Sequence, residues 1–173
     1  MSSPMIVLGI DAAIRRTGYG VVEIKSLDDM KVLDCGVIDT PQKAPHSECL
    51  RRIFGGVAEL IGKFSPDAAA IEGAFFQKNV RTAMILSLAR GAAITAAATA
   101  GVPIFEYAPR KAKKAVVGTG MASKNQVATM ISSFTGIGLD KVPLDSTDAL
   151  AIAICHGQNE IRGENGLVPP KMI

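Results

Sequence analysis

The sequence predicts an α/β fold in which a mixed five-stranded sheet is flanked by helices. Short β-rich apolar segments alternate along the chain with longer segments of helical periodicity. The expected order is three strands, a helix, a strand, a helix, a strand and further helices, and such an order places helices on the faces of one sheet. With 173 residues, 48% of them hydrophobic and 20% charged, the chain suits a single compact domain rather than disorder.

The first three strands follow one another with short connections. Residues 5–11, MIVLGID, are an apolar run that ends in an acid, which predicts a central strand. The segments TGYGVVEIK and KVLDCGVIDT follow, separated by the polar turn SLDD. Consecutive strands with short connections favour an antiparallel meander.

The middle of the chain alternates helix and strand. Residues 47–64 carry apolar side chains at helical spacing, and Pro66 marks the end of that helix. Residues 67–76, DAAAIEGAFF, form the fourth predicted strand. A long helix follows over residues 80–100, and the segment PIFEYAP is the fifth strand.

The last third of the chain is predicted to be helical. A basic segment forms a short helix and then the glycine-containing loop VVGTGMAS. Ser123 is placed to cap a helix through KNQVATMISSF. A final helix ends near residue 158, so a single domain is expected over residues 1–158, with residues 159–173 as a poorly ordered polar tail.

Several classes of protein are disfavoured by composition. The apolar stretch AMILSLARGAAITAAATAG contains Arg90 and is dominated by alanine, which favours a buried helix over a membrane span. The first residues lack the basic region of a signal peptide. The three cysteines form no paired pattern, which is typical of reduced thiols, so we expect a cytoplasmic protein with no membrane partner.

Positive charge is concentrated in one part of the chain. The net charge is only +3, but five basic residues fall in one short segment without an acid: Arg110, Lys111, Lys113, Lys114 and Lys124. A solvated surface and a phosphate-binding face both account for this run, and charge alone does not choose between them.

Four acids mark a candidate site. Asp145 and Asp148 stand three residues apart, so they share one face of a helix, and two like charges need a cation between them. Asp11 ends the first strand and Glu72 lies near the end of the fourth. If those strands are neighbours, their carboxylates meet at one edge of the sheet.

Such a set of acids suits a hard cation. Carboxylate ligands without a His/Cys set favour Mg²⁺ or Mn²⁺ over zinc. Two such ions about 4 Å apart stabilise both the attacking and the leaving oxygen of a phosphodiester. Simpler roles stay open at this point: Asp145 or Asp148 as a helix cap, Asp11 as the start of a turn, and Glu72 as the partner of a lysine.

Four motifs resemble the RuvC family of Holliday junction resolvases. They are GID…RRTGYGVV, AIEGAFFQKN, ARGAAITAAATAGVPIFEYAPRKAKKAVVGTG and DSTDALAIAICH, and they keep the family's order and spacing from about residue 6 to residue 156. The resemblance implies an RNase H-like fold, a homodimer and cleavage of four-way junction DNA with two Mg²⁺ ions per site, for which Mn²⁺ substitutes. It also implies the Ruv branch-migration complex as a partner.

The family's functional residues carry over to positions of this chain. Its four acidic ligands match Asp11, Glu72, Asp145 and Asp148. The aromatic residue that contacts bases at the junction centre matches Phe75, and the two functional lysines match Lys113 and Lys124. Ammonium groups near a scissile phosphate neutralise charge that grows in the transition state. The simpler role for Phe75 is that of a core residue, but Phe76 could fill that role instead. In a strand the two side chains point to opposite faces, so one can be buried while the other is free to stack on a base.

Two departures from the family pattern lie beside the ligands. Ala12 and Ala13 stand where the family has Pro-Gly, and Gly73 stands where it has a polar residue. Two alternative functions therefore stay open: an RNase H-like nuclease that cuts RNA in hybrids, and an inactive junction-binding module. The small residues Ala92, Ala93 and Ala97 of the long helix are expected to contribute to the implied dimer interface.

Overall fold

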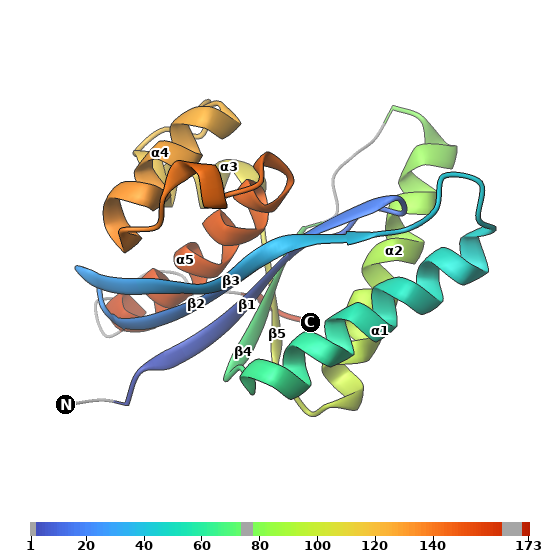
Figure 1. Cartoon of the computed structure of the whole chain (residues 1–173), viewed down its shortest axis with the longest axis horizontal. Helices are drawn as coiled ribbons and strands as arrows, with labels where there is room; N and C mark the ends of the chain where they lie inside the picture. Colours follow the sequence, from blue (N-terminus) through green and yellow to red (C-terminus); the bar gives the residue numbers. More distant parts are fainter. Residues whose placement is uncertain (1–2, 74–77, 164–170) are drawn as a thin grey trace.

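A mixed sheet forms the centre of the computed structural model, which describes residues 3–73, 78–163 and 171–173 (Figure 1). The strands lie in the order β3-β2-β1-β4-β5-β6. Their bounds are Met5–Asp11 for β1, Arg16–Ser26 for β2, Asp29–Asp39 for β3, Ala68–Glu72 for β4, Ile104–Tyr107 for β5 and Lys171–Met172 for β6. The five predicted strands are confirmed, and the two-residue β6 is added at the edge.

The pairing of the strands explains how the site is assembled. Strand β2 pairs antiparallel with both β1 and β3, which confirms the meander, whereas β4 is parallel to β1 and to β5. Because β1 and β4 are parallel neighbours, their carboxyl ends lie at the same edge of the sheet. The last paired residues of the two strands are Ile10 and Ile71, each followed by an acid.

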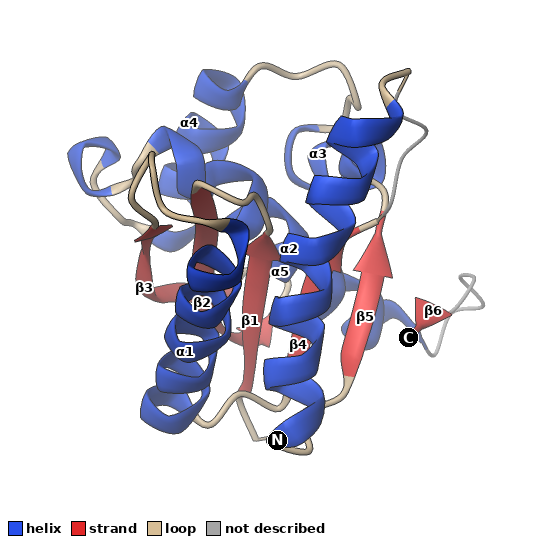
Figure 2. Ribbon diagram, turned by 90° about the vertical axis from the view of Figure 1, so that its right-hand side faces the viewer, coloured by secondary structure: helices blue, strands red, loops and turns tan. Residues whose placement is uncertain are grey.

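Helices cover both faces of the sheet. Helices α1 (His46–Phe64) and α2 (Val80–Thr99) pack on one face and lie in front of the sheet in Figure 2. Helices α3 (Pro109–Val117), α4 (Lys124–Thr135) and α5 (Thr147–Arg162) pack on the other. Two short 3₁₀ helices, η1 (Leu139–Lys141) and η2 (Leu144–Ser146), lead into α5. The predicted α/β class is confirmed.

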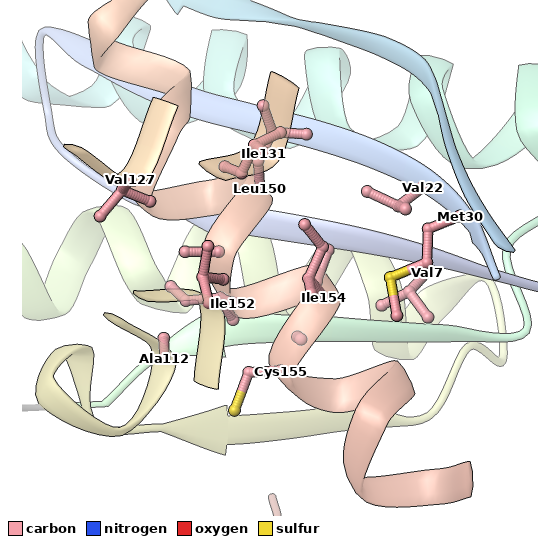
Figure 3. Close-up of a cluster of buried hydrophobic side chains, with 14 of the residues drawn as sticks. Val7, Val22, Met30, Ala112, Val127, Ile131, Leu150, Ile152, Ile154 and Cys155 are labelled. Atoms are coloured by element: carbon pink, nitrogen blue, oxygen red, sulfur yellow. The ribbon is translucent and has the colours of Figure 1, made fainter. Parts of the chain in front are cut away.

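Two hydrophobic cores result from the alternation of side chains along the strands. Val7 belongs to the core under α3, α4 and α5, whereas its neighbour Leu8 belongs to the core under α1 and α2. Figure 3 shows the first of these cores, in which Leu150, Ile152 and Ile154 of α5 are buried. Helix α5 is buried over most of its length and anchors the part of the chain that carries the aspartate pair.

Helix α5 lies unusually close to the sheet because glycines face it. A Cβ atom added at Gly9 in β1 would fall 1.9 Å from the carbonyl oxygen of Ala149. One added at Gly20 in β2 would fall 2.4 Å from a methyl group of Leu150. Any larger side chain at these positions would push α5 away from the strands.

The ends of the elements follow their sequence signals, with two differences. Ser123 caps α4 as expected, and its partner Gln126 completes a capping box. Helix α5 continues to Arg162, beyond the expected boundary at residue 158, because no glycine or proline lies between Gln158 and Gly163. In the same tail, β6 pairs with the outer edge of β5, where backbone groups would otherwise lack a strand partner. Strand β4 ends at Glu72, and residues 74–76 of the predicted strand lie outside the described residues.

Helix α2 is the one helix in the described ranges that is long and apolar enough to cross a membrane by length and composition alone. It packs on α1 and β5 through a stripe of small side chains, and Arg90 in its middle bonds to the sheet. The buried members of the stripe are Ala89, Ala93, Ala96 and Ala97. Small side chains therefore serve close packing of α2 within the chain.

Candidate active site

Asp11 and Glu72 lie next to each other at the carboxyl edge of the sheet. They end the parallel strands β1 and β4, as the sequence predicts, and their side chains share a hydrogen bond. Burial is the main reason why the pKa of Glu72 rises to about 8, and the neighbouring Asp11 raises it further. At neutral pH Glu72 is thus protonated and donates to Asp11.

The pKa of Asp11, the other acid of this pair, is also raised, but by a different combination of effects. Burial raises the pKa of Asp11 most strongly, and the negative charges of Asp148 and Asp145 also raise it. The hydrogen bond from Glu72 and the positive charge of Lys124 oppose that rise. Asp11 is therefore close enough to the other three predicted acids to be affected by each of them.

A close backbone contact brings Asp145 and Asp148 to the same edge. Asp145 lies in η2 and Asp148 in the first turn of α5. A Cβ atom added at Gly18 in β2 would fall 1.9 Å from the carbonyl oxygen of Asp145, so η2 rests directly on that strand. The N-cap of α5 is Ser146, without a side-chain capping bond, so capping does not account for either aspartate.

Basic side chains form ion pairs with the two aspartates. Lys124 Nζ lies 3.3 Å from Asp148 Oδ2, and Lys113 Nζ lies 3.9 Å from Asp148 Oδ1. Burial alone would lower the pKa of Lys124, but the nearby carboxylates, Asp148 first, raise it overall. On the other side, Arg16 Nη2 lies 3.1 Å from Asp145 Oδ2. Each aspartate is thus held by a basic group of this chain.

The donor set fits a hard divalent cation. Asp148 Oδ1 is buried and has no hydrogen-bond partner among the described residues, which leaves one carboxylate oxygen available. Oxygen ligands are what Mg²⁺ and Mn²⁺ prefer. Within the described ranges, however, no three His, Cys, Asp or Glu side chains converge closely enough to form a complete metal cage. Asp145 is paired with Arg16, and Asp148 is paired with the two lysines.

The basic segment divides into two groups. Lys113 of α3 and Lys124 at the start of α4 approach the acids, as expected from the resemblance. The other three side chains are exposed: Arg110, Lys111 and Lys114. Phe75 lies outside the described residues, so its predicted contact with bases stays a prediction.

Sequence reasoning did not single out three residues that lie at this edge. One is Arg16, described above. The other two are Arg90 and Glu106: Arg90 Nε donates to the backbone carbonyl of Glu72 at 2.9 Å, and Arg90 Nη2 lies 2.7 Å from Glu106 Oε2. An arginine in an alanine-rich helix was the available signal, because a charge in such a position requires a partner.

The departures from the family pattern fit their surroundings. Ala12 is buried in the core under α1 and α2, and Thr17 Oγ1 donates to the carbonyl of Ala13 at 2.8 Å, which closes the turn after Asp11. A Cβ atom added at Gly73 would fall 3.1 Å from Cγ of Glu106. The backbone beside Asp11 and Glu72 is therefore well packed although it lacks the family's Pro-Gly and polar residue.

Comparison with known proteins gives one consistent result. The family model described as crossover junction endodeoxyribonuclease RuvC matches residues 7–156. The RuvC endonuclease of Chlorobium phaeovibrioides is 44% identical over 151 residues, which cover 87% of this chain and 80% of the relative. That of Protochlamydia amoebophila is 44% identical over 161 residues, which cover 93% and 95% of the two chains.

Solved structures agree with the sequence comparison. The structure of T. thermophilus RuvC in complex with Holliday junction substrate has a TM-score of 0.88 and 35% identity to this chain, over 98% of this chain and 99% of that one. The predicted RNase H-like fold is therefore confirmed. Nucleases of this family depend on divalent metal ions. Fold, motifs and identity together show that the chain belongs to the RuvC family of crossover junction endodeoxyribonucleases.

Proposed function

We propose that this endodeoxyribonuclease resolves Holliday junctions in recombination and repair by nicking paired strands of four-way DNA, with Asp11, Glu72, Asp145 and Asp148 as its metal ligands. The observation that carries the proposal is the meeting of these acids, from β1, β4, η2 and α5, at one sheet edge beside Lys113 and Lys124. The relative of known structure was solved with Holliday junction substrate.

Two Mg²⁺ ions per site, or Mn²⁺ as substitutes, are the cofactors we propose. When bound, such a pair activates water and stabilises the attacking and leaving oxygens of the phosphodiester. Asp11 and Glu72 would supply oxygens from the strand ends, and Oδ1 of Asp148, which accepts no hydrogen bond from the described residues, would supply one from α5. Asp145 would exchange its contact with Arg16 for this role.

The chain's own groups prepare the site for anionic DNA. Glu72 would have to lose its proton to act as a metal ligand, because a ligand must be ionised. Lys113 and Lys124 stand beside Asp148 and offer ammonium groups to the scissile phosphate. Preorganised cations at that place stabilise charge that develops in the transition state.

A homodimer would present two such sites to strands related by the symmetry of the junction. The expected contribution of Ala93 and Ala97 to its interface is wrong, because both side chains are buried within the chain, and Ala92 is only partly exposed. Support comes instead from large apolar side chains on the outer side of α2: Val80, Met84 and Leu88 are 72%, 65% and 46% exposed. We therefore place the interface on these three residues.

Two further parts of the proposal follow from family membership. The protein acts in the cytoplasm, where chromosomal DNA is found in bacteria, and its unpaired cysteines are compatible with a reducing compartment. Its partner is the Ruv branch-migration complex. A pull-down of purified branch-migration proteins on junction DNA, with and without this chain, tests that partnership.

Substrate choice is the direct test of the proposed activity. The protein is incubated with Mg²⁺ and equal amounts of a labelled four-way junction, a linear duplex of the same sequence and an RNA–DNA hybrid. We expect cleavage of the junction only. Cleavage of the hybrid would identify a different nuclease on the same fold, and junction binding without any nicking would identify an inactive binding module.

A further inference from the structure

Arg90 links helix α2 to two strands of the sheet at the point where β4 ends. Its Nε donates to the backbone carbonyl of Glu72 at 2.9 Å, and its Nη2 lies 2.7 Å from Glu106 Oε2 in β5. The side chains of Arg90 and Glu106 are only 13% and 25% exposed. A short, shielded, charge-assisted contact of this kind fixes geometry more firmly than an exposed ion pair does.

The backbone of Glu72 pairs with Tyr107 of β5 but has no paired residue in β1. The last residue pair of the ladder between β4 and β1 is Ile10–Ile71, so Glu72 lies at the end of that ladder. On the other side, the amide of Gly73 donates to the carbonyl of Tyr107 in β5 at 2.8 Å. The guanidinium of Arg90 therefore supplies a contact that the sheet itself does not make.

Glu106 is held in place by its surroundings as well as by Arg90. A Cβ atom added at Gly73 would lie 3.1 Å from Cγ and 3.4 Å from Oε1 of Glu106. The glutamate thus covers the backbone of Gly73 closely, in space that a larger residue at that position would occupy. Gly73 and Glu106 fit each other, and Arg90 closes the arrangement.

We propose that Arg90 and Glu106 are positioning residues that aim the carboxylate of Glu72 at Asp11 and at the metal. The proposal rests on the assignment of Glu72 as a metal ligand. Mutation of a residue that hydrogen-bonds to a metal ligand and orients it typically lowers metal affinity or activity by about 10–100-fold. Neither Arg90 nor Glu106 needs to touch metal or DNA for this effect.

The test uses Arg90→Gln, Arg90→Lys and Glu106→Gln in the full chain. Binding of Mn²⁺ alone is measured by calorimetry, junction affinity without divalent metal by fluorescence anisotropy, and junction cleavage over a range of Mg²⁺ concentrations. We expect Arg90→Gln to weaken Mn²⁺ binding and slow cleavage at fixed Mg²⁺ by about 10–100-fold, with junction affinity unchanged. Arg90→Lys should recover part of the loss, because an ammonium group reaches one acceptor in place of two.

Two controls separate positioning from loss of charge or of stability. Lys63→Gln removes one positive charge from an exposed ion pair with Asp34, at the end of α1 that precedes β4 and away from the acids. Ile53→Val removes one methyl group from the core under α1 and α2. Both variants should bind Mn²⁺ and cut junctions like the parent.

Each outcome decides the question. Parent-like Mn²⁺ affinity in Arg90→Gln, or equal losses of cleavage and of junction affinity, would overturn the proposal. If Arg90→Gln does not fold, parent-like Mn²⁺ binding by both Arg90→Lys and Glu106→Gln would overturn it instead. A parent protein that binds Mn²⁺ but does not cut junctions would contradict the proposed function alone, whereas a parent that binds no Mn²⁺ would contradict both.

Discussion

Glu72 donates a hydrogen bond to Asp11 across the ends of two adjacent parallel strands. Neither residue is remarkable in the sequence by itself, since the two lie in segments separated by a helix. Because β1 and β4 are parallel neighbours, the two acids that end them lie side by side and form one half of the candidate site. Gly18 and the buried α5 bring Asp145 and Asp148 to complete it.

Loss of any one acid should remove cleavage but not DNA binding. A proposed metal ligand is deleted in each of four variants: Asp11→Asn, Glu72→Gln, Asp145→Asn and Asp148→Asn. Loss of a residue that only orients a ligand typically costs about 10–100-fold in activity, so loss of the ligand itself should slow cleavage by more than that. Junction affinity should stay near that of the parent, because binding depends on phosphate contacts. Single-turnover cleavage and anisotropy measure the two effects. A variant that nicks at the parent rate in Mg²⁺ would remove its residue from the site.

The proton on Glu72 gives a pH dependence with a definite sign. Its pKa is about 8 in the folded protein and 4.5 when unperturbed, so between these values the folded state holds a proton that the unfolded state has lost. Without divalent metal, this group's contribution to the free energy of unfolding is therefore greatest below about pH 4.5 and decreases up to about pH 8. Urea unfolding in EDTA at several pH values measures it.

The matched variant for this measurement is Glu72→Gln, which has no ionisable group at the position. The stability difference between parent and variant should shift against the parent as the pH rises. Divalent metal should reduce the shift, because it favours the ionised ligand. A difference that does not change between pH 5 and pH 8 would contradict the shared proton.

The two lysines near Asp148 should act on rate more than on binding. Lys113→Ala and Lys124→Ala remove cations that we propose to act on the scissile phosphate, and loss of one such preorganised group costs about 100-fold or more in rate. A lysine that only binds phosphate would instead weaken binding to all DNA and reduce the salt slope by about one. Affinity against salt concentration, measured beside the cleavage rate, distinguishes the roles. Lys114→Ala is the control, because that side chain is exposed on the same helix.

Gly18 should be essential for the placement of Asp145. A methyl group at this position would fall 1.9 Å from the carbonyl oxygen of Asp145, so Gly18→Ala must shift η2 or β2. Overpacking of this kind costs about 1–3 kcal/mol of stability, and the displaced ligand should also lower the cleavage rate. Gly62→Ala in α1 is the control, because nothing lies within 4 Å of the added Cβ. That variant should be about 0.5–1 kcal/mol more stable than the parent, with unchanged cleavage.

The outer side of α2 should control assembly. Leu88→Glu places a charge on the exposed apolar surface that includes Met84, so we expect a folded monomer in place of a dimer. Leu27→Glu, in the turn between β2 and β3, is the control at a similarly exposed apolar position. Light scattering measures the mass. A parent mass equal to that of one 18.1 kDa chain at micromolar concentration would contradict the dimer.

Much of the fold was predictable because local signals agree with the final structure. Apolar runs gave the five strands, Pro66 and Ser123 marked helix ends, and the expected meander is present. The edge strand β6 was not predicted, because two residues carry no periodicity. Ala97 was assigned to the wrong side of α2, since a helix with apolar residues all round does not show which stripe is buried.

The candidate site was only partly predictable from the sequence. The four acids were found because they follow strands or begin a helix, which is a positional signal. Arg16, Arg90 and Glu106 were not, because their partners depend on how distant elements pack. The absence of a converged metal cage in the described ranges was also not foreseen, and neither was the contact between Asp145 and Arg16, because spacing along the chain does not reveal either.

Cleavage of a cruciform in a supercoiled plasmid tests the central claim most directly. Paired nicks across a junction convert the plasmid into linear DNA within one binding event, whereas unpaired nicking yields open circles. With Mg²⁺ the parent protein should produce linear DNA with symmetric nicks at the cruciform base, and Asp11→Asn should produce none. Intact plasmid, or open circles alone, after incubation of a folded parent protein with Mg²⁺ would contradict the account.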